Sequence, residues 1–232
     1  MSIIHDTFIA PPCHDTIDIL YQDEHLVLIN KPSGLLSLSG KNSQNLDSVH
    51  HRLVQTFPGC TLIHRLDFGT SGLMVIARNK AINAALCQQF SQRSVTKIYS
   101  ALLCGHLLEN DGVIDAAIAK DPALFPLMSL CELTGKPARS RYRVVERFYQ
   151  EGEDGMELPL TRVELTPETG RTHQLRIHCQ QLGHPILGCD LYGGRLLRGT
   201  EHTPRLMLHA SELHFVHPIS EETIKAQHAS PF

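Results

Sequence analysis

Apolar and polar residues alternate along several short stretches of the chain, which is the pattern of half-buried β-strands. Ile17, Ile19 and Tyr21 alternate in this way, and residues 25–30 follow after a polar turn. The continuous apolar run from Gly72 to Ala77 has the length of a strand. Further strands are predicted at residues 97–103, 140–148, 157–165, 205–209 and 212–217.

Three other stretches have the composition or spacing of helices. The first covers residues 46–57, where apolar residues recur every four positions and an aspartate stands near the start. The second, residues 80–90, is rich in Ala, Leu and Gln. The third follows the turn at Thr169-Gly170, with Thr172 as the expected N-cap. Its expected core face carries Leu175, Cys179 and Leu182.

The order of these elements predicts the fold class. Strands outnumber helices and often follow one another directly, which favours an α+β fold with a mostly antiparallel, mixed sheet flanked by helices and loops. No Ser/Gly-rich linker divides the chain. We therefore expect an N-terminal tail at residues 1–15 and a single domain at residues 16–232. Residues 151–155 are expected to form the tip of a hairpin.

Composition narrows the class of protein. The seven cysteines form no CxxC pair, which suits a reducing compartment better than a disulfide framework. No apolar run is long enough to span a bilayer, and the N-terminus lacks the features of a secretory signal. These observations predict a cytoplasmic protein without a membrane partner.

Net charge by itself disfavours a nucleic-acid partner. The formal charge is −3, whereas proteins that coat nucleic acids are usually basic. Residues 136–147 nevertheless hold five basic side chains against one acidic side chain. Arg139, Arg141 and Arg143 alternate on a predicted strand and would share one face. This face is a candidate for phosphate contacts, although most charge runs are simply solvated.

A carboxylate lies in a glycine-flanked loop just before the strand at 72–77. The segment is His64-Arg65-Leu66-Asp67-Phe68-Gly69-Thr70-Ser71-Gly72. Loops at strand ends commonly carry catalytic groups. On local features alone, a turn in which Asp67 or Thr70 merely bonds to the backbone is the favoured interpretation.

Six short segments occur in the same order as the motifs of a known enzyme family. They are Asn30-Lys31-Pro32-Ser33-Gly34-Leu35, His64-Arg65-Leu66-Asp67, Lys97-Ile98-Tyr99, Thr169-Gly170-Arg171-Thr172-His173-Gln174-Leu175-Arg176, Gly183-His184-Pro185-Ile186-Leu187-Gly188 and Arg205-Leu206-Met207-Leu208-His209-Ala210. Together they resemble the motifs of the RluA-type pseudouridine synthases, and the spacing resembles the RluA subgroup most. The resemblance implies a pseudouridine synthase fold with one catalytic domain and no S4 RNA-binding domain.

The resemblance also implies roles for individual residues. Asp67 would be the catalytic carboxylate, Tyr99 would line the uracil pocket and Arg176 would pair with the aspartate. Arg65 would occupy the space left by a flipped base, and Leu208 would lie at the RNA site. Phosphate contacts are expected from Lys31, Arg139, Arg141, Arg143, Arg171, Arg195 and Arg198.

These residue types suit the reaction. Breaking the N1–C1′ bond of uridine and joining C5 to C1′ is an isomerisation, so no cofactor is chemically required. A carboxylate beside C1′ or C6 is needed, and it stays ionised in a dry pocket if a guanidinium pairs with it. Whether Asp67 attacks C1′, attacks C6 or promotes glycal formation stays open. From the residues alone, Arg176 is equally well a solvated helix charge. For Tyr99 the residues alone favour a tyrosine in the core.

One position departs from the family pattern. The family usually has Gly-Asp where this chain has Gly188-Cys189, and Asp190 follows one place later. Because that acidic position is not the catalytic one, we expect the departure to change a local turn or loop contact and not the reaction.

Two other functions compete with the synthase. His173, His178, Cys179, His184 and Cys189 cluster in the sequence, but zinc spacings such as CxxC or HExxH are absent, so no metal is expected. A non-catalytic RNA-binding module could use the same basic face, but it would not need Asp67.

The RNA target follows only from the resemblance. The RluA subgroup modifies a stem-loop of 23S rRNA and the anticodon stem-loop of some tRNAs, which implies RNA as the partner of a monomeric enzyme. A synthase of a related subgroup that acts on another rRNA or tRNA site is the alternative.

Overall fold

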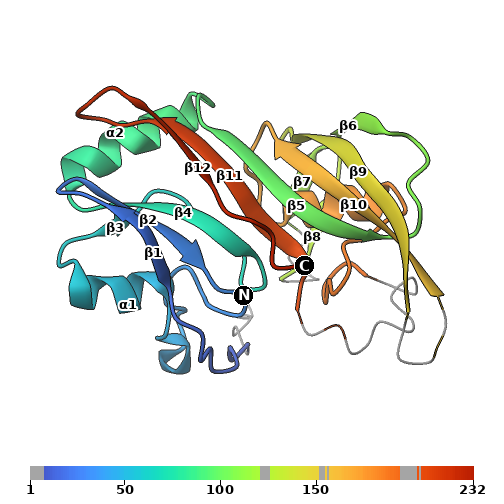
Figure 1. Ribbon diagram of the computed structural model, residues 1–232, viewed down its shortest axis with the longest axis horizontal. Coiled ribbons are helices and arrows are strands. Elements are labelled where there is room, and N and C mark those ends of the chain that lie inside the picture. Colours follow the sequence, from blue (N-terminus) through green and yellow to red (C-terminus); the bar gives the residue numbers. More distant parts are fainter. Residues whose placement is uncertain (1–7, 121–125, 152–154, 156, 194–202, 204) are drawn as a thin grey trace. The chain divides into compact units, whose positions relative to one another are not determined.

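The computed structural model describes residues 8–120, 126–151, 155, 157–193, 203 and 205–232 (Figure 1). The chain divides into two compact units. The first comprises Met1–Val95 and Leu213–His228, and the second comprises Thr96–Glu212 and Ala229–Phe232. Strand β11 (Leu208–Val216) contributes residues to both units.

The strands of the first unit surround a fully buried strand. This strand is β4 (Ser71–Ala77), and its apolar run was the clearest strand signal in the sequence. It pairs antiparallel with β2 (Leu26–Lys31), and β2 pairs antiparallel with β1 (Asp18–Gln22). The short strand β3 (Thr61–Leu62) also pairs with β4, and β12 (Thr223–Gln227) pairs with β11.

Two helices complete the first unit. Helix α2 (Lys80–Ser91) packs against β3 and β4, and the side chain of Asn79 caps it by accepting from the amide of Ile82. Helix α1 (Val49–Thr56) begins three residues later than predicted. The reason is that Ser43–Asn45 form a 3-10 turn, and the Ser48 hydroxyl accepts the amide of His51 as the N-cap.

The second unit is built on long antiparallel strands. Strand β10 (Glu157–Pro167) lies between β5 (Thr96–Cys104) and β9 (Arg139–Glu151), and β6 (Asp111–Asp115) pairs with the far side of β9. Strands β7 (Ile118–Lys120) and β8 (Met128–Leu130) form a separate pair. Most of the predicted hairpin tip at 151–155 lies outside the described residues.

Helix α3 (Gln174–Gln181) is the only helix among the described residues of the second unit, and six consecutive residues of it are buried. Leu175 and Cys179 face the core as predicted. The predicted cap is wrong, because the N-cap position belongs to His173, which has a left-handed backbone with φ of 56° and makes no side-chain cap bond.

The α+β prediction with mostly antiparallel strands is confirmed. One error concerns the end of the sheet, where two strands were predicted at 205–209 and 212–217. The chain forms one strand, β11, because Ser211 does not break it. The Ser211 hydroxyl lies 3.0 Å from the Ser100 hydroxyl and 3.3 Å from the carbonyl of Ile98. No described helix is long and apolar enough to cross a membrane.

Candidate active site

The loop that carries Asp67 connects β3 to β4 in the first unit. Ser37 holds the backbone of this loop at Leu66. The buried hydroxyl of Ser37 donates to the carbonyl of Leu66 (2.7 Å) and accepts the amide of the same residue (3.1 Å). The side chain of Leu66 is buried beside it. The amide of Thr70 donates to the carbonyl of Asp67, so the loop does contain the turn that local features predicted. Asp67 itself is half-buried and Arg65 is exposed.

The Asn-Lys-Pro-Ser-Gly segment holds the other side of this loop. Lys31 is fully buried, and its ammonium group donates to the carbonyls of Pro32 (2.8 Å), Leu35 (2.7 Å) and Phe68 (3.2 Å). The amide of Gly34, whose φ is 75°, also donates to Phe68. Lys31 was predicted to contact phosphate. Its burial and its three carbonyl partners make it a support of the loop that carries Asp67 instead.

Residues 8–15, which we call the N-terminal segment, pack beside the same loop. The ring of Phe8 meets that of Phe68 edge-on, with centroids 5.5 Å apart. The buried Asn45 side chain accepts the amide of Ala10 (2.8 Å) and donates to the carbonyl of Phe8 (2.7 Å). Further along, Arg52 donates to the carbonyls of Cys13 and Asp15. The segment contains no helix or strand, yet side chains of the first unit anchor it at both ends.

Tyr99 lies in β5 of the second unit. It is half-buried, pairs in register with Leu165 and packs against the core of this unit. Leu208, the first residue of β11, is 3% exposed and belongs to the same core. In this structure Leu208 therefore packs in the core. Its side chain has almost no exposed surface with which to contact RNA, contrary to its predicted position at the RNA site.

Arg176 is buried in α3, with 4% of its surface exposed, and is not the solvated helix charge of the alternative interpretation. Its Nε donates to the sulfur of Cys189 (3.3 Å), and its Nη2 forms an ion pair with Asp190. Its guanidinium also lies over the ring of Tyr192, 5.5 Å from the centroid. The departure at Cys189 therefore reaches a predicted catalytic residue, contrary to our expectation that it would change only a local contact.

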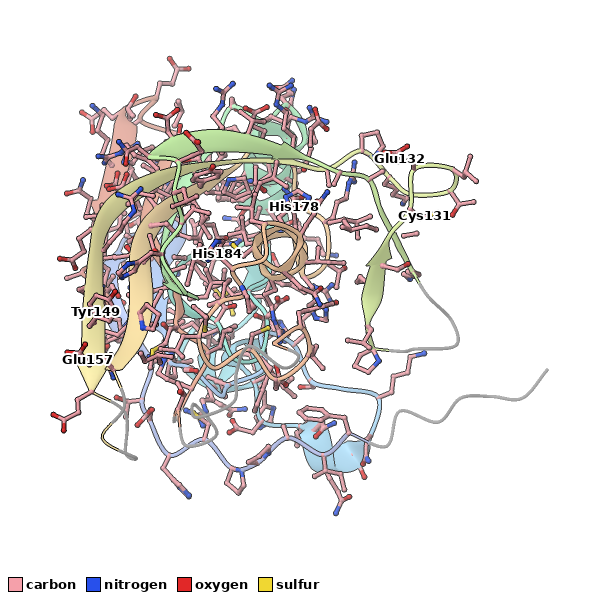
Figure 2. The ribbon with its side chains drawn as sticks, turned by 90° about the vertical axis from the view of Figure 1, so that its right-hand side faces the viewer. Cys131, Glu132, Tyr149, Glu157, His178 and His184 are labelled. Carbon is pink, nitrogen blue, oxygen red and sulfur yellow. The ribbon has the colours of Figure 1, made fainter. Side chains whose placement is uncertain are left out.

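A buried polar network sets the position of α3. Thr169 donates to the side-chain oxygen of Gln174 (2.7 Å), and Gln174 donates to the Ser140 hydroxyl (2.9 Å). The Ser140 hydroxyl lies 2.9 Å from Nδ1 of His178, a buried residue of α3 (Figure 2). Desolvation lowers the pKa of His178. Periodicity could not reveal these four residues, because each is polar and none follows an apolar stripe.

Acidic neighbours compensate the basic strand. Ser140 and Tyr142 are buried while Arg141 and Arg143 are exposed, so the predicted alternation is correct. Arg141 pairs with Glu168 (2.6 Å), Arg143 with Glu164 (2.7 Å), and Arg139 with both Asp115 and Glu168. RNA phosphates would have to replace these carboxylates.

The three other arginines that were predicted to contact phosphate lie elsewhere. Arg171 donates to the carbonyl of Pro137, and Arg195 and Arg198 lie outside the described residues.

The histidines of the rival zinc site have other partners. Nδ1 of His173 lies 2.9 Å from the Tyr192 hydroxyl, and Nδ1 of His184 lies 2.8 Å from the carbonyl of Cys104. Within the described part of the chain, no group of three His, Cys, Asp or Glu side chains is arranged to hold a metal ion.

Comparisons with known proteins cover most of the chain. Residues 25–181 match the RNA pseudouridylate synthase family, and this range runs from the first unit into the second. The chain is 43% identical over 210 residues to the dual-specificity RNA pseudouridine synthase RluA of Vibrio parahaemolyticus, which covers 90% of this chain and 82% of that protein. It is 41% identical over 208 residues to the RluA of Escherichia coli, covering 90% of each.

Solved structures agree. Human RNA pseudouridylate synthase domain containing 1 matches with a TM-score of 0.77 and 32% identity, covering 96% of this chain and 86% of that chain. Human RNA pseudouridylate synthase domain containing 4 matches with a TM-score of 0.70 and 28% identity, over 92% of this chain and 88% of that one. These two proteins therefore share the fold of this chain over most of its length.

Proposed function

The chain belongs to the RNA pseudouridylate synthase family, and we propose that Asp67 carries out its reaction on two kinds of RNA. The activity is the isomerisation of uridine to pseudouridine in RNA. The observation that carries the assignment of Asp67 is its loop, whose backbone is bonded from two sides by Ser37 and Lys31 while the carboxylate remains half-buried. Such bonding holds a reacting group in a defined place.

The proposed roles of the other residues follow from their chemistry. Arg176 supplies a guanidinium, the group that keeps a reacting carboxylate ionised when water is excluded. Tyr99 stacks on the uracil, and its hydroxyl helps to move the proton from C5. Arg65, which is exposed on the catalytic loop, takes the place of the flipped uridine in the RNA. Residues 16–232 act as one catalytic domain, because the family match includes residues of both compact units.

We further propose that the RNA targets are a stem-loop of 23S rRNA and the anticodon stem-loop of tRNA. The name of the relatives, dual-specificity RNA pseudouridine synthase, supports two targets. We also propose that the enzyme acts as a monomer in the cytoplasm; the bacterial origin of the relatives is consistent with the cytoplasm. A related specificity for one other rRNA or tRNA site is the second candidate.

Replacing Asp67 by Asn tests the catalytic role. The amide has nearly the same size but is a poor nucleophile, so we expect pseudouridine formation on RNA transcripts to fall by at least roughly a thousandfold. RNA binding, measured by filter retention or anisotropy, is expected to persist. Asp111→Asn, which changes an exposed aspartate in β6, is the matched control and is expected to retain activity. Full activity of Asp67→Asn would refute the assignment.

Pseudouridine mapping tests the targets. We expect rRNA and tRNA from cells that lack this gene to lose one pseudouridine in 23S rRNA and one in the anticodon stem-loop of some tRNAs. Complementation with the unaltered gene is expected to restore both, and complementation with Asp67→Asn to restore neither. Loss at a single different site would favour the related specificity.

A further inference from the structure

Three neighbours along the chain surround the guanidinium of Arg176. Cys189 meets Nε through its sulfur, Asp190 pairs with Nη2, and the ring of Tyr192 lies against the flat face of the group. Nε and Nη2 form one edge of the guanidinium, so these contacts fix both its plane and the direction of that edge.

The ring of Tyr192 is itself held in place. Its hydroxyl accepts the amide of Met128 in β8 (2.9 Å) and lies 2.9 Å from Nδ1 of His173. The ring is buried, with 4% exposed. The flat surface on which Arg176 rests is therefore anchored independently of Arg176.

The backbone at residue 188 determines where the next two side chains point. Gly188 has a φ of 73°, and a Cβ at this position would stand 2.0 Å from the carbonyl oxygen of Arg205. Only glycine is compatible with this close approach. The amides of Leu187 and Met207 add backbone bonds on the same segment, to Leu102 and Leu187 respectively. The sulfur of Cys189 consequently stays buried beside Nε, with 1% of the residue exposed.

The two side chains of the Arg176–Asp190 ion pair differ sharply in exposure. The Asp190 side chain is 76% exposed, whereas the Arg176 side chain is 5% exposed. Of the two side chains on the Nε–Nη2 edge, only Asp190 carries a charge, and it does so from the surface. A buried guanidinium needs such a counter-charge to keep one orientation.

Building on the proposed function, we propose that Asp190 is a positioning residue that orients Arg176 for the reaction. It supplies the carboxylate that the family pattern would place at residue 189. Cys189 fills that buried position and contacts Nε without a charge. The synthase activity of this chain thus depends on an exposed aspartate that lies one residue after the acidic position of the family pattern.

The first test is Asp190→Asn in the full-length protein. We expect kcat for pseudouridine formation to fall roughly tenfold to a hundredfold, because a misdirected guanidinium no longer stabilises the reacting groups. KM for the RNA is expected to change no more than in the control. The control is Glu132→Gln, which removes one negative charge from an exposed turn of the same unit (Figure 2).

Two further variants separate positioning from a general effect of charge. Asp190→Glu keeps the carboxylate and is expected to retain more kcat than Asp190→Asn. Cys189→Asp added to Asp190→Asn places a carboxylate next to Nε and is expected to recover part of the lost kcat. Equal kcat for Asp190→Asn and Glu132→Gln would overturn the proposal. A loss that neither carboxylate restores would overturn it as well.

The outcome also distinguishes this role from the proposed function. If the unaltered protein forms no pseudouridine, or if Asp67→Asn stays active, the assignment of the reaction fails and the positioning role fails with it. If the unaltered protein is active, Asp67→Asn is inactive and Asp190→Asn matches its control, only the role of Asp190 is refuted.

Discussion

Two buried cations show how single residues support the candidate site. Lys31 satisfies its three donors with three carbonyl oxygens, one of them on the residue that follows Asp67. Arg176 rests on an aromatic ring and meets a sulfur and a carboxylate. Burying a charge is costly unless such partners are present. The burial of both side chains therefore depends on these partners, and replacing a partner also changes the position or the stability of the buried cation.

His178 gives a pH dependence at the scale of one residue. Burial lowers its pKa in the folded protein, while its Nε2 faces the carbonyl of Ala116 at 3.2 Å and Asp115 opposes the shift. Below the ordinary pKa of histidine, near 6.5, the unfolded chain therefore takes up a proton first. The contribution of His178 to stability is complete above that pH and decreases as pH falls towards the lower, folded pKa.

Urea unfolding at several pH values measures this effect. We expect His178 to add a slope of at most about 1.4 kcal/mol per pH unit to the free energy of unfolding between pH 6.5 and the folded pKa. His178→Gln removes the titration, so its free energy of unfolding should fall less on going from pH 7.5 to 5.5. Equal pH dependence of the two proteins would contradict the expected shift.

At the scale of elements, the N-terminal segment behaves as part of the first unit. It has no regular structure, but the side chain of Asn45 makes two hydrogen bonds to it, and Phe8 contacts Phe68 in the loop that carries Asp67. An element without internal hydrogen bonds depends entirely on such anchors. The segment is thus sensitive to residues far from it in sequence.

Asn45→Ala removes both anchoring hydrogen bonds. We expect the free energy of unfolding to decrease by about 1–2 kcal/mol, and amide exchange in residues 8–15 to become faster while β4 stays protected. Hydrogen exchange followed by mass spectrometry makes the comparison. Asn42→Ala is the matched control, because Asn42 caps only the local 3-10 turn. Unchanged exchange in residues 8–15 would show that other contacts hold the segment.

Element boundaries were less predictable than element types. Apolar spacing identified α1 and α3, composition identified α2, and the continuous apolar run identified β4. The start of α1 was missed because the Ser48 cap and the 3-10 turn before it carry no apolar signal. Strands β7, β8 and β12 are short or largely exposed, so alternation could not reveal them.

At the scale of the whole molecule, the order of the motifs predicted the family and a role for each motif residue, but not the contacts that these residues make. Asp67 and Arg176 were selected from their motifs, whereas the bond from Ser37 to the loop of Asp67 and the contacts of Arg176 with Cys189 and Asp190 are not encoded in any spacing. The basic strand was predicted from sequence, yet its carboxylate partners come from β6, β10 and the turn after β10. Long-range pairing of this kind requires the fold.

The buried ammonium group of Lys31 has a consequence for how relatives of this chain are recognised. Arginine cannot replace it, because a guanidinium needs more room and a different donor geometry than three converging carbonyls provide. The requirements of folding alone would therefore preserve a lysine at this position, even in a descendant that had lost its enzymatic activity. A lysine aligned with Lys31 thus indicates shared architecture, whereas under the proposed function activity also requires an aspartate aligned with Asp67.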